Sequence, residues 1–277
     1  MELKKTNLIC FSPTSTSKQV GNPIVHGVGN ENVQVWDVTT VAAEEYVIPE
    51  TEIVVIAVPV YGGRVAPLAL QRMKGLKGNE TPAILVVVYG NRAYERALME
   101  LDAFAIRQGF KVIGCATFVG EHSYHTAQNP IAQGRPNADD LSLAAEFGKK
   151  LAQKVRDADS AERLYPVDVR SIRRPKQSLF GLLRFLRGVI KMRKSKIPVP
   201  KTPTTDEELC IHCGLCVKKC PTGAIKKGEE QLTLVDKCIR CCACVKSCPQ
   251  QARSLNTPFA PLLSKNFPRQ KQPQTLL

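Results

Sequence analysis

Hydrophobic residues in the first 160 positions occur in short continuous runs rather than in strict alternation with polar residues. The runs cover residues 7–11, 52–60, 83–89 and 111–119, with a weaker one at 33–36. Continuous apolar runs of this length, rich in Val and Ile, are typical of strands that are buried on both faces of a parallel sheet. The pattern therefore predicts five strands in one buried sheet.

Segments with helical spacing of apolar residues separate these runs. We predict helices over 65–74, 92–108 and about 138–157, and a weakly patterned helix around His26. Alternation of strands and helices predicts an α/β fold with helices on both faces of the sheet. In such folds ligands bind beyond the carboxyl ends of the strands, so the loops that follow the runs form the candidate site.

Three of these loops carry residue types suited to a flat, phosphorylated ligand. The first has hydroxyl side chains where a helix begins, and the N–H groups of a helix N-terminus attract phosphate. The other two combine aromatic rings with glycines, which let the backbone approach a flat ring closely. The candidate ligand-binding residues are Ser12, Thr14, Ser15, Thr16, Ser17, Pro59, Val60, Tyr61, Gly62, Gly63, Tyr89, Gly90, Asn91 and Tyr94. Taken alone, the first loop also fits a Ser/Thr-rich helix cap.

With these three loops, residues 5–158 resemble flavodoxin. The resemblance implies a doubly wound five-stranded parallel sheet of order 2-1-3-4-5 and a bound FMN, with its phosphate in the first loop and its ring between the other two. One position departs from the family pattern, because Ser15 stands where flavodoxins usually have glycine. A side chain there opposes the tight turn that the loop must make.

The loop after the last run contains Glu121, His122 and His125. Beside a flavin, Glu121 or His122 would be able to relay protons to the reduced ring. The alternative is that these are loop residues whose polar atoms meet solvent or backbone.

Nine of the eleven cysteines lie in two runs with the spacing C-x2-C-x2-C-x3-C-P, which start at Cys210 and Cys238. This spacing is typical of [4Fe-4S] ligation. Structural zinc sites instead use two ligand pairs with a spacer. Disulfides need an oxidising compartment, and Met1–Cys10 does not have the pattern of a secretory signal. The runs therefore predict iron-sulfur clusters in a reducing, cytoplasmic setting.

With both runs, residues 206–255 resemble a bacterial two-cluster ferredoxin. In that family the fourth cysteine of each run ligates the other cluster. The resemblance thus assigns Cys210, Cys213, Cys216 and Cys248 to cluster 1, and Cys238, Cys241, Cys244 and Cys220 to cluster 2. Cys242 is left over and is either a spare ligand or a small packed residue. His212 is expected to tune the hydrogen bonding of a neighbouring cluster rather than to ligate it.

The formal net charge is +14, and the segment 169–201 holds eleven Arg or Lys residues with no Asp or Glu. No nucleic-acid recognition motif accompanies this charge, so we expect no nucleic-acid partner. A basic amphipathic helix is predicted over about 178–195. Its apolar side would pack on the chain's own domains and leave the basic side to an acidic redox partner, or it would lie on an anionic membrane surface. No apolar stretch is long enough to span a membrane.

These segments divide the chain into a flavodoxin-like domain (1–165), a basic linker (166–204), a ferredoxin domain (205–256) and an extended tail (257–277). As a whole the chain resembles the flavodoxin-ferredoxin fusion proteins of anaerobic bacteria and archaea. The resemblance implies an electron carrier that links two [4Fe-4S] clusters, FMN and a redox partner. Two alternatives remain open, an FMN-dependent reductase of a quinone, a nitro compound or another small oxidant, and an iron-sulfur redox sensor or adaptor without flavin.

Overall fold

The computed structural model describes residues 3–158, 160, 163–196 and 198–277. Residues 1–2, 159, 161–162 and 197, which fall within the predicted first domain and linker, lie outside the described residues. The chain divides into two compact units. The first contains the chain up to Gly120, Gly134–Pro175 and Lys271–Leu277, and the second contains Glu121–Gln133 and Lys176–Gln270.

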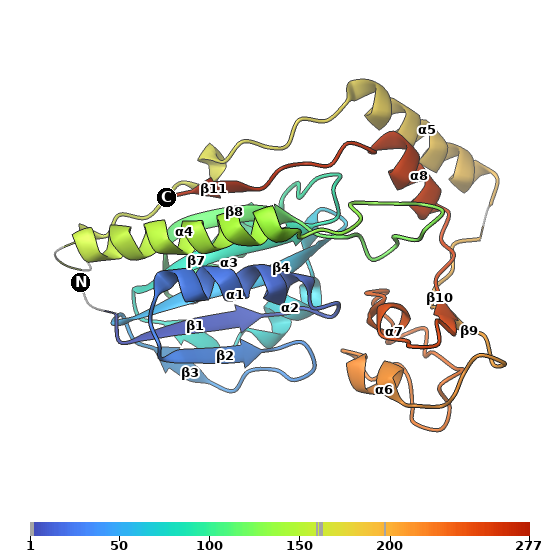
Figure 1. Ribbon diagram of the computed structural model, residues 1–277, viewed down its shortest axis with the longest axis horizontal. Helices are drawn as coiled ribbons and strands as arrows, with labels where there is room; N and C mark the ends of the chain where they lie inside the picture. The colour runs from blue at the N-terminus through green and yellow to red at the C-terminus, as the bar shows by residue number, and fades with distance from the viewer. Residues whose placement is uncertain (1–2, 159, 161–162, 197) are drawn as a thin grey trace. The chain divides into compact units, whose positions relative to one another are not determined.

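The first unit is built on a mainly parallel sheet (Figure 1). Its five parallel strands are β1 (Lys5–Cys10), β2 (Val33–Asp37), β4 (Glu52–Tyr61), β7 (Thr81–Tyr89) and β8 (Phe110–Val119). They pair in the order β2-β1-β4-β7-β8, which is the predicted order 2-1-3-4-5. The predicted fold class is therefore confirmed.

Burial along the strands explains this order. Strands β7 and β8 are buried along almost their whole length, whereas β2 alternates between exposed and half-buried residues. Continuous apolar runs thus occupy the centre of the sheet, where both faces are covered, and the weakest run is on the edge next to β1.

Helices cover both faces of this sheet. Helices α1 (Thr16–Val28) and α4 (Ala138–Asp157) lie side by side on one face, with α2 (Pro67–Arg72) and α3 (Ala97–Arg107) on the other (Figure 1). Close packing of α1 on α4 depends on two glycines, Gly27 and Gly148. A Cβ on Gly27 would lie 2.1 Å from the carbonyl oxygen of Ala145, and a Cβ on Gly148 would lie 2.1 Å from that of Ile24. The remaining short elements of this unit are β3 (Tyr46–Ile48), β5 (Arg64–Val65), β6 (Leu76–Gly78) and the 3-10 helix η2 (Val169–Ser171).

The C-terminal tail differs from the extended arm that the sequence predicted. It contains helix α8 (Phe259–Asn266) in the second unit and strand β11 (Gln274–Leu276) in the first, where β11 pairs antiparallel with β8. Its prolines do not prevent these elements, because Pro258 is the N-cap of α8 and Pro261 lies in the first turn. Pairing at a sheet edge uses backbone N–H and C=O groups and needs little patterning of side chains. The sequence therefore shows no apolar period that would predict β11.

The second unit contains the cysteine runs. It has helix α5 (Leu179–Lys194), the short helices α6 (Leu215–Lys219) and α7 (Ala243–Lys246), and an antiparallel pair of β9 (Thr204–Thr205) with β10 (Arg253–Ser254). The loop 121–133 also belongs to this unit, although it follows β8 directly in the chain. Among the described residues, no helix is both long enough and apolar enough to cross a bilayer.

Candidate functional site

The two cysteine runs fold in the same way. In each run the residue before the second cysteine has a positive φ, 52° for His212 and 54° for Arg240. The residue after it is the left-handed N-cap of a short helix, Gly214 before α6 and Cys242 before α7. These turns place the third cysteine of each run in the first turn of its helix, and both of these cysteines are buried. The repeat in sequence is therefore a repeat in backbone conformation.

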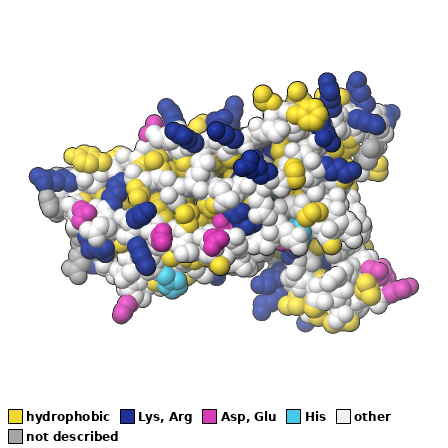
Figure 2. Space-filling model, turned by 45° about the horizontal axis from the view of Figure 1, so that its top comes forward, with side chains coloured by type: hydrophobic (Ala, Val, Ile, Leu, Met, Phe, Trp, Pro, Cys, Tyr) yellow, Lys and Arg dark blue, Asp and Glu magenta, His cyan; other side chains and the backbone are white. Residues whose placement is uncertain are grey.

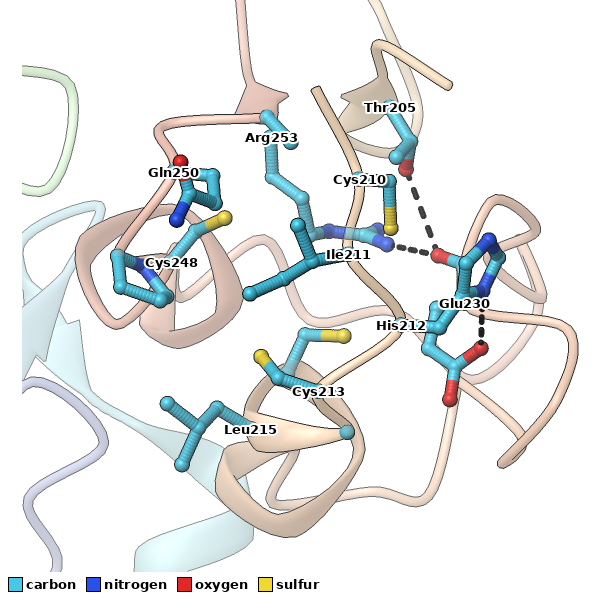
Figure 3. Close-up of a pocket in the computed structure, with 14 residues that line it drawn as sticks. Thr205, Cys210, Ile211, His212, Cys213, Leu215, Glu230, Cys248, Gln250 and Arg253 are labelled. Carbon is cyan, nitrogen blue, oxygen red and sulfur yellow. Dashed lines mark hydrogen bonds and ion pairs between the residues drawn. The ribbon is translucent and has the colours of Figure 1, made fainter. Parts of the chain in front are cut away.

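The first three cysteines of run one share a pocket with the last cysteine of run two. Cys210, Cys213, Cys216 and Cys248 all line it, together with apolar residues such as Ile211 and Leu215. Figure 3 shows the sulfur atoms of Cys210, Cys213 and Cys248 around this pocket. This is the grouping that crossed ligation requires for cluster 1.

The last cysteine of run one lies instead with run two. Cys220 packs against a small apolar cluster that contains Cys244 of run two and Cys216 of run one, and its charge is felt by Cys241 of run two. Burial, together with the neighbouring charges of Cys244, Cys220 and Cys238, raises the pKa of Cys241 to about 12. Cys241 and Cys244 are buried and Cys220 and Cys238 half-buried. Neighbouring thiols of this kind cannot all ionise unless cations compensate their charge, and iron in a cluster supplies that compensation. The donor set and its surroundings therefore fit a second [4Fe-4S] cluster.

Cys242 is a packed residue at a backbone position normally given to glycine. It is buried with a φ of 59°, and it occupies the place of Gly214 in the first run. Burial raises the pKa of its thiol, and its Sγ lies 3.7 Å from the carbonyl oxygen of Arg240.

Two further residues beside these cysteines, Arg253 and Glu230, escaped the sequence analysis. The buried guanidinium of Arg253 donates hydrogen bonds to the carbonyl oxygen of Glu230 and to Oγ1 of Thr233. Although burial raises the pKa of Cys244 overall, the charge of Arg253 and a hydrogen bond from it act in the opposite direction. Arg253 therefore stabilises negative charge on the sulfur of Cys244.

The carboxylate of Glu230 accepts a hydrogen bond from the N–H of Gly228 at 3.0 Å and pairs with Nδ1 of His212 at 3.1 Å. These contacts lower the pKa of Glu230 to about 2. The charge of this carboxylate fixes the ring of His212, the residue expected to tune the neighbouring cluster. Glu230 and Arg253 lie outside the cysteine motifs, so spacing alone gave no signal for them.

The first loop of the α/β unit makes its turn despite the missing glycine. Ser15 adopts φ 64° as the N-cap of α1, so it takes the left-handed conformation that glycine would take more readily. Oγ of Ser12 accepts a hydrogen bond from the N–H of Lys18 at 3.1 Å. The hydroxyl oxygens of Thr14 and Thr16 lie 3.3 Å apart, and Ser17 is buried. A helix of 13 residues follows, whose first N–H groups have no partner within the helix. The loop thus offers donors suited to a phosphate.

The second loop is a tight hairpin between β4 and β5. Tyr61 is half-buried and pairs with Arg64, and Pro59 and Val60 lie at the end of β4. Gly62 and Gly63 have φ of 60° and 82°, and a Cβ on Gly63 would lie 2.4 Å from a carboxylate oxygen of Glu95. The positive φ therefore favours glycine at both positions, and at Gly63 the side chain of Glu95 also leaves little space.

The third loop turns its aromatic rings inward. Tyr89 and Tyr94 are both buried and meet edge to face, with their ring centroids 5.6 Å apart. Asn91 is buried with φ 66°, and its Oδ1 accepts a hydrogen bond from the N–H of Lys271 at 2.9 Å. Gly90 remains half-buried. The structure thus brings the three loops to the carboxyl ends of β1, β4 and β7, but only Tyr61 keeps an aromatic ring partly exposed.

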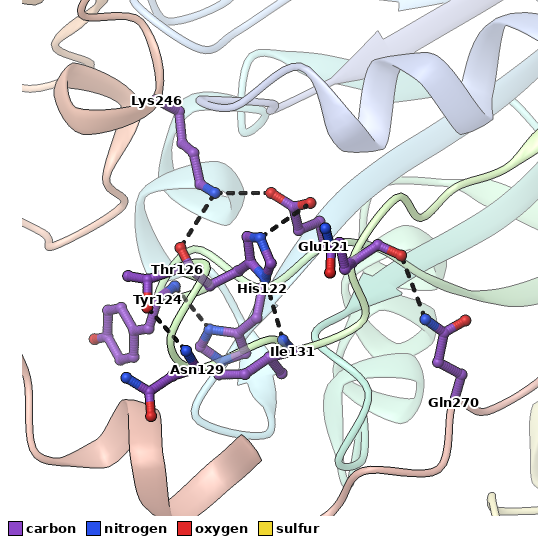
Figure 4. A network of polar contacts seen from close by, with 10 residues as sticks. Glu121, His122, Tyr124, Thr126, Asn129, Ile131, Lys246 and Gln270 are labelled. Atoms are coloured by element: carbon purple, nitrogen blue, oxygen red, sulfur yellow. Dashed lines mark hydrogen bonds and ion pairs between the residues drawn. The ribbon is translucent and has the colours of Figure 1, made fainter. Parts of the chain in front are cut away.

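The predicted proton-relay residues lie in the second unit, in a polar network (Figure 4). Oε1 of Glu121 accepts a hydrogen bond from Nζ of Lys246 at 2.7 Å, and Oε2 lies 3.8 Å from Nε2 of His125. Nδ1 of His122 accepts the N–H of Tyr124 at 3.0 Å. The ion-pair partner of Glu121 is therefore Lys246, from the second cysteine run, and the histidine facing this carboxylate is His125 rather than His122.

Comparison with known proteins identifies part of the chain. Residues 203–226 match the family model described as "4Fe-4S binding domain". The chain joins a flavodoxin-like α/β unit to a ferredoxin-type 4Fe-4S segment. The flavodoxin-like character rests on the strand order described above, and the ferredoxin-type character on the family match and the two cysteine runs.

Solved structures that match the chain include a flavodoxin from the domain Archaea (15% identity, TM-score 0.37), and the match covers 55% of this chain and 99% of the flavodoxin. A Streptococcus pneumonia TIGR4 flavodoxin has 17% identity and TM-score 0.37, with the same shares covered. An azoreductase from Bacillus anthracis has 11% identity and TM-score 0.36, and it covers 55% of this chain and 100% of its own. No curated protein matches the chain.

Proposed function

We propose that this protein transfers electrons between two [4Fe-4S] clusters and FMN, and from there to a redox partner protein. The observation that carries the proposal is the position of Cys248, which lines one pocket with Cys210, Cys213 and Cys216 although it belongs to the other run. A pair of independent metal sites would keep each run's cysteines together, whereas an exchange of the fourth cysteine is typical of two-cluster ferredoxins.

The ligands follow from the two groupings of cysteines. Cys210, Cys213, Cys216 and Cys248 would hold the first cluster, and Cys238, Cys241, Cys244 and Cys220 the second. Apolar neighbours shield Cys216 and Cys244 from water, whereas Cys213 is exposed, and Arg253 adds a positive charge. Both features influence the reduction potential of a cluster.

The first unit supplies the residues for FMN. Thr14, Ser15, Thr16 and the N-terminus of α1 would hold the phosphate. The backbone at Gly62 and Gly90 and the ring of Tyr61 would contact the flavin ring, while Tyr89 and Tyr94 support the third loop from inside. When bound, FMN exchanges one or two electrons whereas each cluster exchanges one, so the protein would connect carriers of both kinds.

The test is the metal and flavin content of protein purified without air. Two clusters require about eight iron atoms per chain and give a broad absorption shoulder at about 400 nm. One bound FMN adds resolved flavin bands above that shoulder. Bound zinc, or about four iron atoms, would refute the two-cluster proposal. Iron without flavin would refute the FMN part alone. Steady consumption of a quinone with a chemical reductant would favour the reductase alternative over the carrier.

A further inference from the structure

Helix α5 has two different apolar sides. On one side, Leu182 and Phe185 pack in a cluster with Ile131, Leu263 and Phe267 of the same unit. The contact with α8 is close, because a Cβ on Gly188 would lie 2.5 Å from a methyl carbon of Leu262. This side already satisfies the packing that an amphipathic helix of a globular protein requires.

The other side carries a second apolar row that remains at the surface. Leu179, Leu183, Leu186 and Ile190 follow one another at spacings of three and four, so they share one face of the helix. Each of them is between 46% and 78% exposed. Isolated exposed leucines are common, but a continuous row along a helix marks an interaction surface.

Basic residues border this row. Arg184, Arg187, Lys191, Arg193 and Lys194 are all exposed on α5, and no acidic residue occurs between positions 169 and 201. Within the described part of the chain, none of these five forms an ion pair with a carboxylate. In the upper right of Figure 2, hydrophobic side chains at the surface stand beside Lys and Arg side chains in the region of α5.

Charge and shape together point to one occupant. A second copy of this face would oppose cations to cations, so self-association is disfavoured. An acidic protein would pair with the cations but would leave a convex aliphatic row without a complementary pocket. An anionic lipid surface satisfies both features, because the aliphatic side chains enter the acyl boundary while Lys and Arg reach the headgroups.

We propose that α5 binds the surface of an anionic phospholipid bilayer, lying in the plane of the interface with Leu179, Leu183, Leu186 and Ile190 toward the acyl chains. The flanking cations contact the phosphates of the lipid headgroups. The helix has only 16 residues and is charged on the remaining side, so it lies on the membrane and does not cross it. The inference does not depend on whether FMN is bound.

The first experiment is co-sedimentation of the full-length holoprotein, kept without air, with two kinds of vesicle. We expect it to sediment with vesicles of phosphatidylcholine and phosphatidylglycerol in a ratio of about 7 to 3, and much less with phosphatidylcholine alone. Binding should weaken as salt rises, because the attraction to anionic lipid is screened. Failure to bind the anionic vesicles at low salt would overturn the proposal.

Two double variants separate the apolar and the basic contributions. Leu183→Ser with Ile190→Ser should lower partitioning roughly tenfold or more. Arg187→Gln with Lys194→Gln should lower it by about fivefold for each cation removed. All four side chains are exposed, so the visible spectrum of the clusters should not change.

The matched controls change similar residues elsewhere on the surface. Val41→Ser removes an exposed apolar side chain and Lys149→Gln an exposed cation, both outside α5, and both should bind vesicles like the wild type. If Val41→Ser weakened binding as much as the Leu183/Ile190 variant, the assignment to α5 would be wrong.

A fluorescent reporter tests insertion itself. Phe180→Trp places an indole on the exposed part of α5, and its emission should shift to the blue when anionic vesicles are added. An unchanged emission with salt-dependent binding would mean that only the charges act, which would overturn insertion of the apolar row. Retention on immobilised poly-glutamate without any vesicle binding would show an acidic protein partner instead.

Discussion

Crossed ligation makes a quantitative prediction about pairs of cysteine substitutions. If Cys248 serves cluster 1, then Cys248→Ala removes one of its four ligands and costs about four of the eight irons. Cys213→Ala should cost the same four, since Cys213 lines the same pocket. The double variant Cys213→Ala/Cys248→Ala should therefore retain about four irons.

Combining Cys248→Ala with Cys241→Ala gives the opposite result. Cys241 lies with Cys220, Cys238 and Cys244, so this pair removes one ligand from each cluster and should leave almost no iron. The two double variants thus differ in iron content although each loses two cysteines. The losses caused by Cys213→Ala and Cys248→Ala do not add, which is expected when both cysteines belong to one site.

The assay is iron content together with electron paramagnetic resonance of the reduced protein, all without air. Cys242→Ala is the matched control, because it removes a buried cysteine of the second run and should keep about eight irons. If Cys213→Ala/Cys248→Ala lost all iron while Cys241→Ala/Cys248→Ala kept four, each run would bind its own cluster and the pairing inferred from the pocket would be wrong.

Three further predictions concern single residues. Ser15→Gly should stabilise the fold by about 1 kcal/mol in thermal unfolding, since glycine adopts the left-handed turn without the cost that an L-residue pays, whereas Ser15→Val should not stabilise it; equal behaviour of the two would contradict the strain argument. The pKa of Glu100 is lowered by its hydrogen bond from Arg64, so its charged form stabilises the folded state above pH 4.5 and that contribution disappears as the pH falls through the lowered value. The stability difference between wild type and Glu100→Gln, measured by urea unfolding, should therefore shrink between pH 7 and pH 3, and a constant difference would exclude this linkage. Arg253→Gln should lower the reduction potential of the cluster bound by Cys244 in a redox titration, because a positive charge near the ligands favours the reduced form; a raised potential would disprove the electrostatic role of this guanidinium.

Much of the fold was predictable from local patterns. The five strand runs appear as the five parallel strands, in the order expected for a flavodoxin-like sheet, because central strands must be apolar on both faces. Helices were predicted at 138–157 and about 178–195, and the structure has helices at Ala138–Asp157 and Leu179–Lys194. At 92–108 the helix begins only at Ala97, since residues 92–96 form a bend and a turn after β7.

Side-chain direction was not predictable in the same way. The sequence placed aromatic rings at the third loop, but whether Tyr89 and Tyr94 face a ligand or each other depends on neighbours that are distant in sequence. The backbone N–H of Lys271 donates a hydrogen bond to the side-chain amide oxygen of Asn91, which is 180 positions away in the chain. Such contacts have no local signature, because a loop residue can be satisfied by any segment that reaches it.

The sequence by itself determined the iron chemistry of this protein and the class of its first unit. The cysteines of one run lie within a few residues of one another, and the apolar pattern of a buried strand covers only a few successive residues. Short stretches of the sequence are therefore enough to predict both. Only the tertiary structure brought Cys248 to the first run, Arg253 to Cys244 and Lys246 to Glu121. These contacts between distant residues form only when the unit folds. The free energy that brings distant segments together comes from burying the apolar surface of the whole unit, and not from the residues that come into contact there.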